Sequence, residues 1–153
     1  MDERRRALVA KIGENISVRR LATLESEGHL GAYRHGTRIG ALVSVVGGDA
    51  ALAHDIAMHV AATNPAYLSV ADVPADVVAK MVEGRIRKTL NEKVLLGQPF
   101  VKDPDQTIEK LLKAAKAEVK SFQRFEVGAG IEKKQDDFVG EVMAQVKASS
   151  GAG

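Results

Sequence analysis

The sequence has 153 residues, of which 45% are hydrophobic and 27% charged, and these shares are typical of a globular domain with its own core. It contains no cysteine, which excludes disulfides, thiolate catalysis and zinc sites built on cysteine. The 22 basic and 20 acidic residues give a formal net charge of +2, a balance that argues against a nucleic-acid partner. No apolar run approaches the ~20 residues that a membrane span needs, so a soluble, cytoplasmic protein without a membrane partner is expected.

The chain begins with a predicted amphipathic helix from Asp2 to Asn15. Its apolar residues Leu8, Val9 and Ile12 recur at helical spacing among basic side chains. After this helix the pattern of apolar residues changes, and residues Ile16 to Leu24 are predicted to be extended.

A β-hairpin is the clearest local signal. Predicted strands His29 to Arg34 and Thr37 to Val46 flank a turn at Gly36, whose φ can be positive. The second strand is apolar on both faces near its end, which predicts a central place in its sheet. Asp49 is then placed to cap a helix from Ala50 to Ala62.

The second half of the chain mixes helices with one strand. Helices are predicted from Ala75 to Lys88 and from Thr107 to Lys116, and the stretch Asn91 to Asp105 between them, with its glycine and prolines, is predicted to lie irregularly on the surface. Residues Val119 to Val127 alternate as a strand that would join the hairpin. A last amphipathic helix is predicted from Gln135 to Ala148.

This order of elements predicts an α+β fold, with a small antiparallel sheet packed by helices. Residues 1–133 are expected to form the core domain, and 134–153 a C-terminal helical module and tail. In that module Phe138, Val142 and Val146 repeat every fourth residue and form an apolar stripe.

No residue pattern indicates catalysis. His54 and His59 lie five positions apart on one predicted helix, about 140° around its axis, which disfavours a shared metal ion. His59 falls on the apolar stripe of that helix and has two readings: a half-buried histidine satisfied by a backbone group, or a contact residue. We therefore predict a binding protein with no catalytic residue, no metal and no cofactor.

Five blocks of the sequence, in one order along the chain, resemble the elongation factor Ts family. They are residues 7–16 (ALVAKIGENI), 35–40 (HGTRIG), 55–62 (DIAMHVAA), 97–101 (GQPFV) and 124–133 (RFEVGAGIEK). Together they reach from residue 7 to residue 133, so the resemblance covers nearly the whole chain.

The resemblance implies a guanine nucleotide exchange factor of translation elongation. Such a protein binds the GTPase domain of elongation factor Tu and promotes GDP release through protein binding, without covalent chemistry. The positions that match the family's contact residues near the nucleotide site are Ile39, Gly40, Met58 and His59. The apolar stripe of the 134–153 module resembles the family's C-terminal module, which docks on the same GTPase domain.

Two departures from the family bear on activity. The family's N-terminal domain, with its Thr-Asp-Phe-Val-Ala-Lys segment beside the magnesium site, is expected to lie upstream of this sequence. A helical-hairpin insertion is also expected to be shortened where Lys80 runs into Met81. Impaired exchange is the resulting expectation. The alternative is a protein-binding or scaffold module without exchange activity, and RNA binding is a weaker third.

Overall fold

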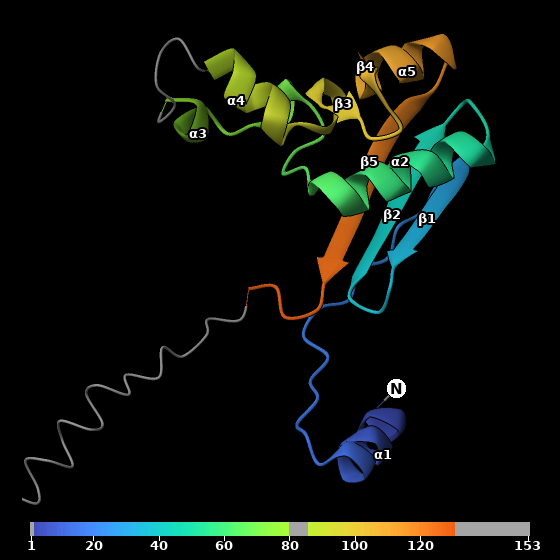
Figure 1. Ribbon diagram of the computed structural model, residues 1–153, viewed down its shortest axis with the longest axis vertical. Helices are drawn as coiled ribbons and strands as arrows, with labels where there is room; N and C mark the ends of the chain where they lie inside the picture. Colours follow the sequence, from blue (N-terminus) through green and yellow to red (C-terminus); the bar gives the residue numbers. More distant parts are fainter. Residues whose placement is uncertain (1, 80–85, 131–153) are drawn as a thin grey trace, which may run out of the picture.

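The computed structural model describes residues 2–79 and 86–130 (Figure 1). The helices are α1 (Asp2–Ile12), α2 (Ala50–Thr63), α3 (Ala75–Ala79), α4 (Ile86–Lys93) and α5 (Ile108–Ala114), with short 3-10 turns η1 (Val70–Asp72) and η2 (Leu95–Gly97). The strands are β1 (His29–His35), β2 (Ile39–Val46), β3 (Pro99–Phe100), β4 (Asp103–Thr107) and β5 (Glu118–Glu126). The predicted α+β class is confirmed.

The main sheet has three antiparallel strands in the order β1-β2-β5, so β2 is central as predicted. The hairpin turn between β1 and β2 has Gly36 at φ +58°, the left-handed region that favours glycine. His35 pairs with Ile39 at the end of this ladder, and Ile39 pairs in turn with Glu126 of β5. We call this end of the sheet the hairpin end.

Helix α2 covers one face of the sheet (Figure 1). Asp49 caps it by accepting a hydrogen bond of 2.7 Å from the Leu52 N–H. The helix lies so close to β1 that a Cβ at Gly31 would stand 2.0 Å from the Ala53 carbonyl oxygen. Close approach lets Ile56 and Val60 pack fully buried against the strands.

The prediction that residues Asn91 to Asp105 form an irregular surface loop is wrong. The end of α4, η2, β3 and the start of β4 occupy this stretch, and Leu95 and Phe100 belong to the same core as α2. The backbone joins these elements tightly, because Ile108 N–H donates to the Gln98 carbonyl at 3.0 Å. This stretch therefore forms one end of the core.

The N-terminal helix is confirmed but contributes no buried side chain. It ends at Ile12, before Gly13 takes a φ of +78°, and Leu8 stays about half exposed. Residues 13–28 then run without regular structure along the face of the sheet that α2 leaves open, where Ser44 Oγ donates to Ser26 Oγ at 2.8 Å. We call this the open face, although that segment crosses part of it.

The remaining predicted helices differ from the observed ones in their bounds. The helix predicted to end at Lys88 corresponds to α3 and α4, and α4 continues to Lys93; residues 80–85 lie outside the described part. In α5 the predicted first residue, Thr107, is instead the N-cap. The helix predicted from Gln135 to Ala148 lies outside the described residues.

No helix in the described part of the chain is both long and apolar enough to cross a membrane.

Candidate functional site

A groove of about 490 Å³ lies between the hairpin end of the sheet and the second half of α2. Its walls come from β1, β2, β5, α2 and the turn between β3 and β4. We call it the α2 groove, and its lining residues are Tyr33, His35, Ile39, Met58, Ala61, Ala62, Val101, Lys102 and Arg124. Two of the predicted partner-binding residues, Ile39 and Met58, therefore line the same groove.

The structure separates the predicted pair Ile39 and Gly40. Successive residues of a strand point to opposite faces, so Ile39 faces α2 while Gly40 lies on the open face. Gly40 stands in register with Arg34 of β1 and Phe125 of β5. A partner seated in the α2 groove would contact Ile39 and would reach Gly40 only around the hairpin end.

Met58 and His59 also differ in their access to solvent. Met58 is half-buried at the edge of the groove, whereas the His59 side chain is 0% exposed and lies beneath it. The predicted half-buried histidine is thus fully buried. In this conformation a partner would reach the residues that His59 holds and not its ring.

Both ring nitrogens of His59 have hydrogen-bond partners. The backbone N–H of Val101 donates to Nδ1 at 3.3 Å, and Nε2 lies 2.9 Å from Oε1 of Gln98. Since Nδ1 accepts, the proton of the neutral ring sits on Nε2 and is donated to Gln98. His59 therefore fixes the turn that carries Val101 into the α2 groove.

Gln98 is the second centre of this buried network. Its Oε1 also lies 2.9 Å from the Thr63 hydroxyl, and its Nε2 donates to the Glu92 carbonyl at 2.7 Å. The side chain therefore ties α2 to the end of α4. Because Gln98 is 5% exposed, water cannot replace these bonds without local opening.

Burial lowers the pKa of His59, and the hydrogen bond with Gln98 partly opposes that shift. A second ring proton would sit on Nδ1 and face the Val101 N–H, so two donors would point at each other. The neutral ring is the form that holds the turn.

Charged side chains frame the groove. Lys102 Nζ lies 2.7 and 2.8 Å from the two carboxylate oxygens of Asp55 on α2. Arg124 donates to the Ala61 carbonyl at 3.0 Å and to Oε2 of Glu126 at 3.0 Å, which joins β5 to the end of α2. The groove thus presents an apolar floor with a rim of paired charges.

Reasoning from the sequence missed the β3–β4 turn. Val101 and Lys102 fell in the presumed surface loop, and Gln98 was not considered a structural residue. A signal was present, since Gln98 and Val101 belong to the block GQPFV that carries part of the family resemblance. Tyr33 and Arg124 lie on predicted strands, but alternation alone gave them no role.

Two further predictions concern the C-terminal module and metal binding. Phe138, Val142 and Val146 lie outside the described residues, as does the boundary at 133/134, and these remain predictions. Among the residues that the structure describes, no group of three or more histidine, aspartate or glutamate side chains could hold a metal ion.

Comparison with known proteins adds a family to this geometry. The family model described as elongation factor TS matches residues 1–81 and 74–129. Elongation factor Ts of Nitrosomonas eutropha is 51% identical over 166 residues, which cover 95% of this chain and 56% of that protein. The protein of the same name from Methylococcus capsulatus is 53% identical over 171 residues, with 97% and 58% covered. The one from Hydrogenovibrio crunogenus is 48% identical over 172 residues, with 99% and 58% covered.

The alignments cover only part of each relative and contain gaps. The chain spans less than three fifths of the length of these relatives. Each alignment is also longer than the chain's 153 residues, so the relatives carry positions without a counterpart here. The family match divides around residues 74–81, which agrees with a shortened insertion between Lys80 and Met81.

Proposed function

Since this chain belongs to the elongation factor Ts family, we propose that it binds the GTPase domain of elongation factor Tu and promotes release of GDP. The α2 groove is the proposed contact surface, and residues Ile39 and Met58 are its apolar anchors. The observation that carries this assignment is that one groove gathers two of the positions matched to the family's contact residues, above a third, His59.

The proposed mechanism is differential binding. A protein that binds the nucleotide-free GTPase more tightly than its GDP complex must weaken GDP binding by the same factor. No group on this chain has to act as an acid, base or nucleophile. What the chain supplies is a preformed surface, because the His59 and Gln98 network holds the β3–β4 turn before a partner arrives.

Exchange by this chain is proposed to be slower than exchange by a full-length relative. The support is the shortened insertion and the share of the relatives' length that the chain spans. Binding without acceleration is the alternative function, a protein-binding or scaffold module.

Release of a fluorescent GDP analogue from elongation factor Tu tests the proposal. The chain should accelerate release, and Met58→Ala should reduce that acceleration by roughly tenfold, as expected for an apolar anchor worth about 1–2 kcal/mol. Val70→Ala is the matched control, because Val70 is a 49% exposed apolar residue on η1, outside the α2 groove. Association without faster release would show that the chain binds the GTPase without promoting exchange. Absence of association would refute the proposal and favour a scaffold module whose partner is another protein.

A further inference from the structure

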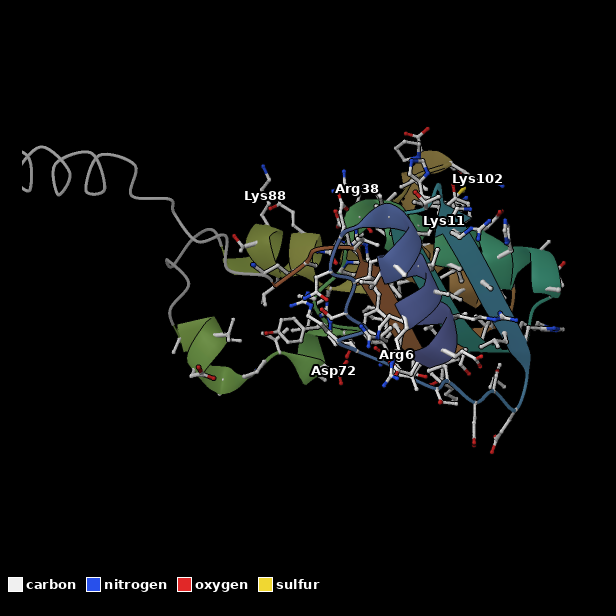
Figure 2. The ribbon with its side chains drawn as sticks, turned by 90° about the horizontal axis from the view of Figure 1, so that it is seen from below. Arg6, Lys11, Arg38, Asp72, Lys88 and Lys102 are labelled. Carbon is white, nitrogen blue, oxygen red and sulfur yellow. The ribbon has the colours of Figure 1, made fainter. Side chains whose placement is uncertain are left out.

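A second and larger hollow lies at the hairpin end on the open face of the sheet. It has a volume of about 600 Å³ and runs between residues 15–20 and the ends of β2 and β5. We call it the arginine groove, because four of its lining residues are Arg19, Arg20, Arg34 and Arg38. Figure 2 views the molecule from this end and labels Arg38, with Arg6 and Lys11 of the neighbouring α1.

The positive charge of this groove is largely uncompensated. The side chains of Arg34 and Arg38 make no hydrogen bond or ion pair within the described residues. Arg19 and Arg20 donate to the backbone carbonyl of Ala129, a neutral acceptor. Among the described residues that line the groove, only Glu126 is acidic, and its carboxylate already pairs with Arg124 at 3.0 Å. The balanced net charge of the sequence therefore hides a local excess of arginine.

The floor of the groove is apolar and open. Gly40 lies in register between Arg34 and Phe125, and a Cβ built on it meets no atom within 4 Å. Arg20 stands 5.2 Å over the Phe125 ring, a cation–π contact that fixes one wall. Val127 adds an apolar side chain that is 65% exposed.

This combination fits a protein segment better than a nucleic acid. Arginine and aromatic residues are enriched at protein interfaces, whereas nucleic-acid surfaces are more polar and depend on many phosphate contacts. A guanidinium presents a planar fork of donors that matches a carboxylate. An overall charge of only +2 gives little long-range attraction for a polyanion.

We propose that the arginine groove binds an acidic protein segment in which carboxylate side chains alternate with apolar ones. The carboxylates would pair with Arg34 and Arg38, and the apolar side chains would lie on the floor over Gly40 beside Phe125. This site lies on the open face and meets the α2 groove at Ile39, which lines both. The proposal stands whether or not the chain promotes nucleotide exchange.

Fluorescence anisotropy with the full chain and a short labelled peptide of alternating glutamate and leucine tests this proposal. The double variant Arg34→Ala/Arg38→Ala should weaken binding roughly tenfold or more, because it removes two charge-assisted contacts. Lys110→Ala/Lys113→Ala removes the same formal charge from two exposed residues of the remote α5 and should leave the affinity unchanged.

Two further arms separate the sources of binding. A peptide with glutamine in place of glutamate should not bind, and single-stranded RNA of equal charge should bind more weakly than the acidic peptide. Equal binding of the glutamine peptide, equal affinity of the arginine variant, or arginine-dependent binding of RNA alone would each overturn the proposal.

A folding control keeps the test decisive. Circular dichroism should show an unchanged fold in the double alanine variant, since both arginine side chains are exposed. If that variant fails to fold, Arg34→Lys/Arg38→Lys replaces it. This variant keeps the charge but loses the forked donors, so it should bind a few times more weakly than the unmodified chain. Unchanged affinity in that variant would contradict the proposed carboxylate recognition.

Discussion

The two faces of the three-stranded sheet differ in what covers them and in how their polar groups are satisfied. On the α2 face, Ile56 and Val43 are fully buried and His59 and Gln98 hydrogen-bond each other. On the open face, Leu30 is 51% exposed, and the arginines that line the groove have no acidic partner among residues 2–79 and 86–130. The α2 face therefore has the buried, hydrogen-bonded side chains of a core, and the open face has the exposed apolar and basic side chains of a candidate binding surface.

This difference shows how one short chain can carry both a rigid site and an adaptable one. The α2 groove is preformed, because the buried network beneath it fixes its wall. In the arginine groove, the side chains of Arg34 and Arg38 are exposed and have no hydrogen bond within the described residues. We therefore expect substitutions on the α2 face to change stability, and substitutions on the open face to change binding alone.

The largest contrast should come from two aliphatic truncations. Ile56→Ala removes a fully buried side chain and should lower the free energy of unfolding by about 2–5 kcal/mol. Leu30→Ala removes as many carbons from the open face and should cost less than about 1 kcal/mol. Urea unfolding followed by circular dichroism measures both. Equal losses would show that the open face is part of the core.

A pair of glutamines gives the next contrast. Gln98→Ala leaves the buried ring N–H of His59 and the carbonyl of Glu92 without this partner and should cost about 1–3 kcal/mol. Gln123→Ala, at an exposed position of β5, should change the free energy of unfolding by no more than about 0.5 kcal/mol. The same unfolding assay applies. A neutral Gln98 variant would mean that the network does not hold the groove wall.

The pH dependence of the free energy of unfolding should reflect protonation of the His59 ring. Its pKa is lowered in the folded chain by burial, so the unfolded chain binds a proton at higher pH. Stability should therefore fall as pH drops below about 6.5, by at most about 1.4 kcal/mol per pH unit, until the folded-state pKa is passed. His59→Gln should flatten the slope below about pH 6.5. An unchanged slope in that variant would place the proton uptake elsewhere.

The smallest effects should come from exposed ion pairs. Lys102→Ala removes the pair with Asp55 at the rim of the α2 groove, and Lys120→Ala removes a pair with Glu118 on β5. Each should cost no more than about 1 kcal/mol in thermal unfolding, because solvent screens such pairs. If Lys102→Ala alone cost several kcal/mol, the rim would belong to the structural network beneath it.

Sequence periodicity predicted the hairpin, α2 and β5 well because each is long enough to show its period. It also placed His59 on the buried stripe of α2. The same alternation separates Ile39 from Gly40, a consequence that can be read from the sequence once β2 is assigned.

The β3–β4 region could not be predicted in this way. Strands of two and five residues show no usable period, and Pro99 and Pro104 read as loop signals. The partner of His59 is Gln98, 39 positions away, and no local pattern reveals such a pairing. The arginine groove was hidden for a related reason, because folding brings Arg19 and Arg38 together while composition records only a balanced charge.

The central claim, that the chain promotes exchange by differential binding, is tested most directly by isothermal titration calorimetry against elongation factor Tu with and without GDP. The account predicts tighter binding to the nucleotide-free protein, by the same factor with which the chain weakens GDP binding. Equal affinity for the two forms would contradict it, since a ligand without preference shifts no equilibrium.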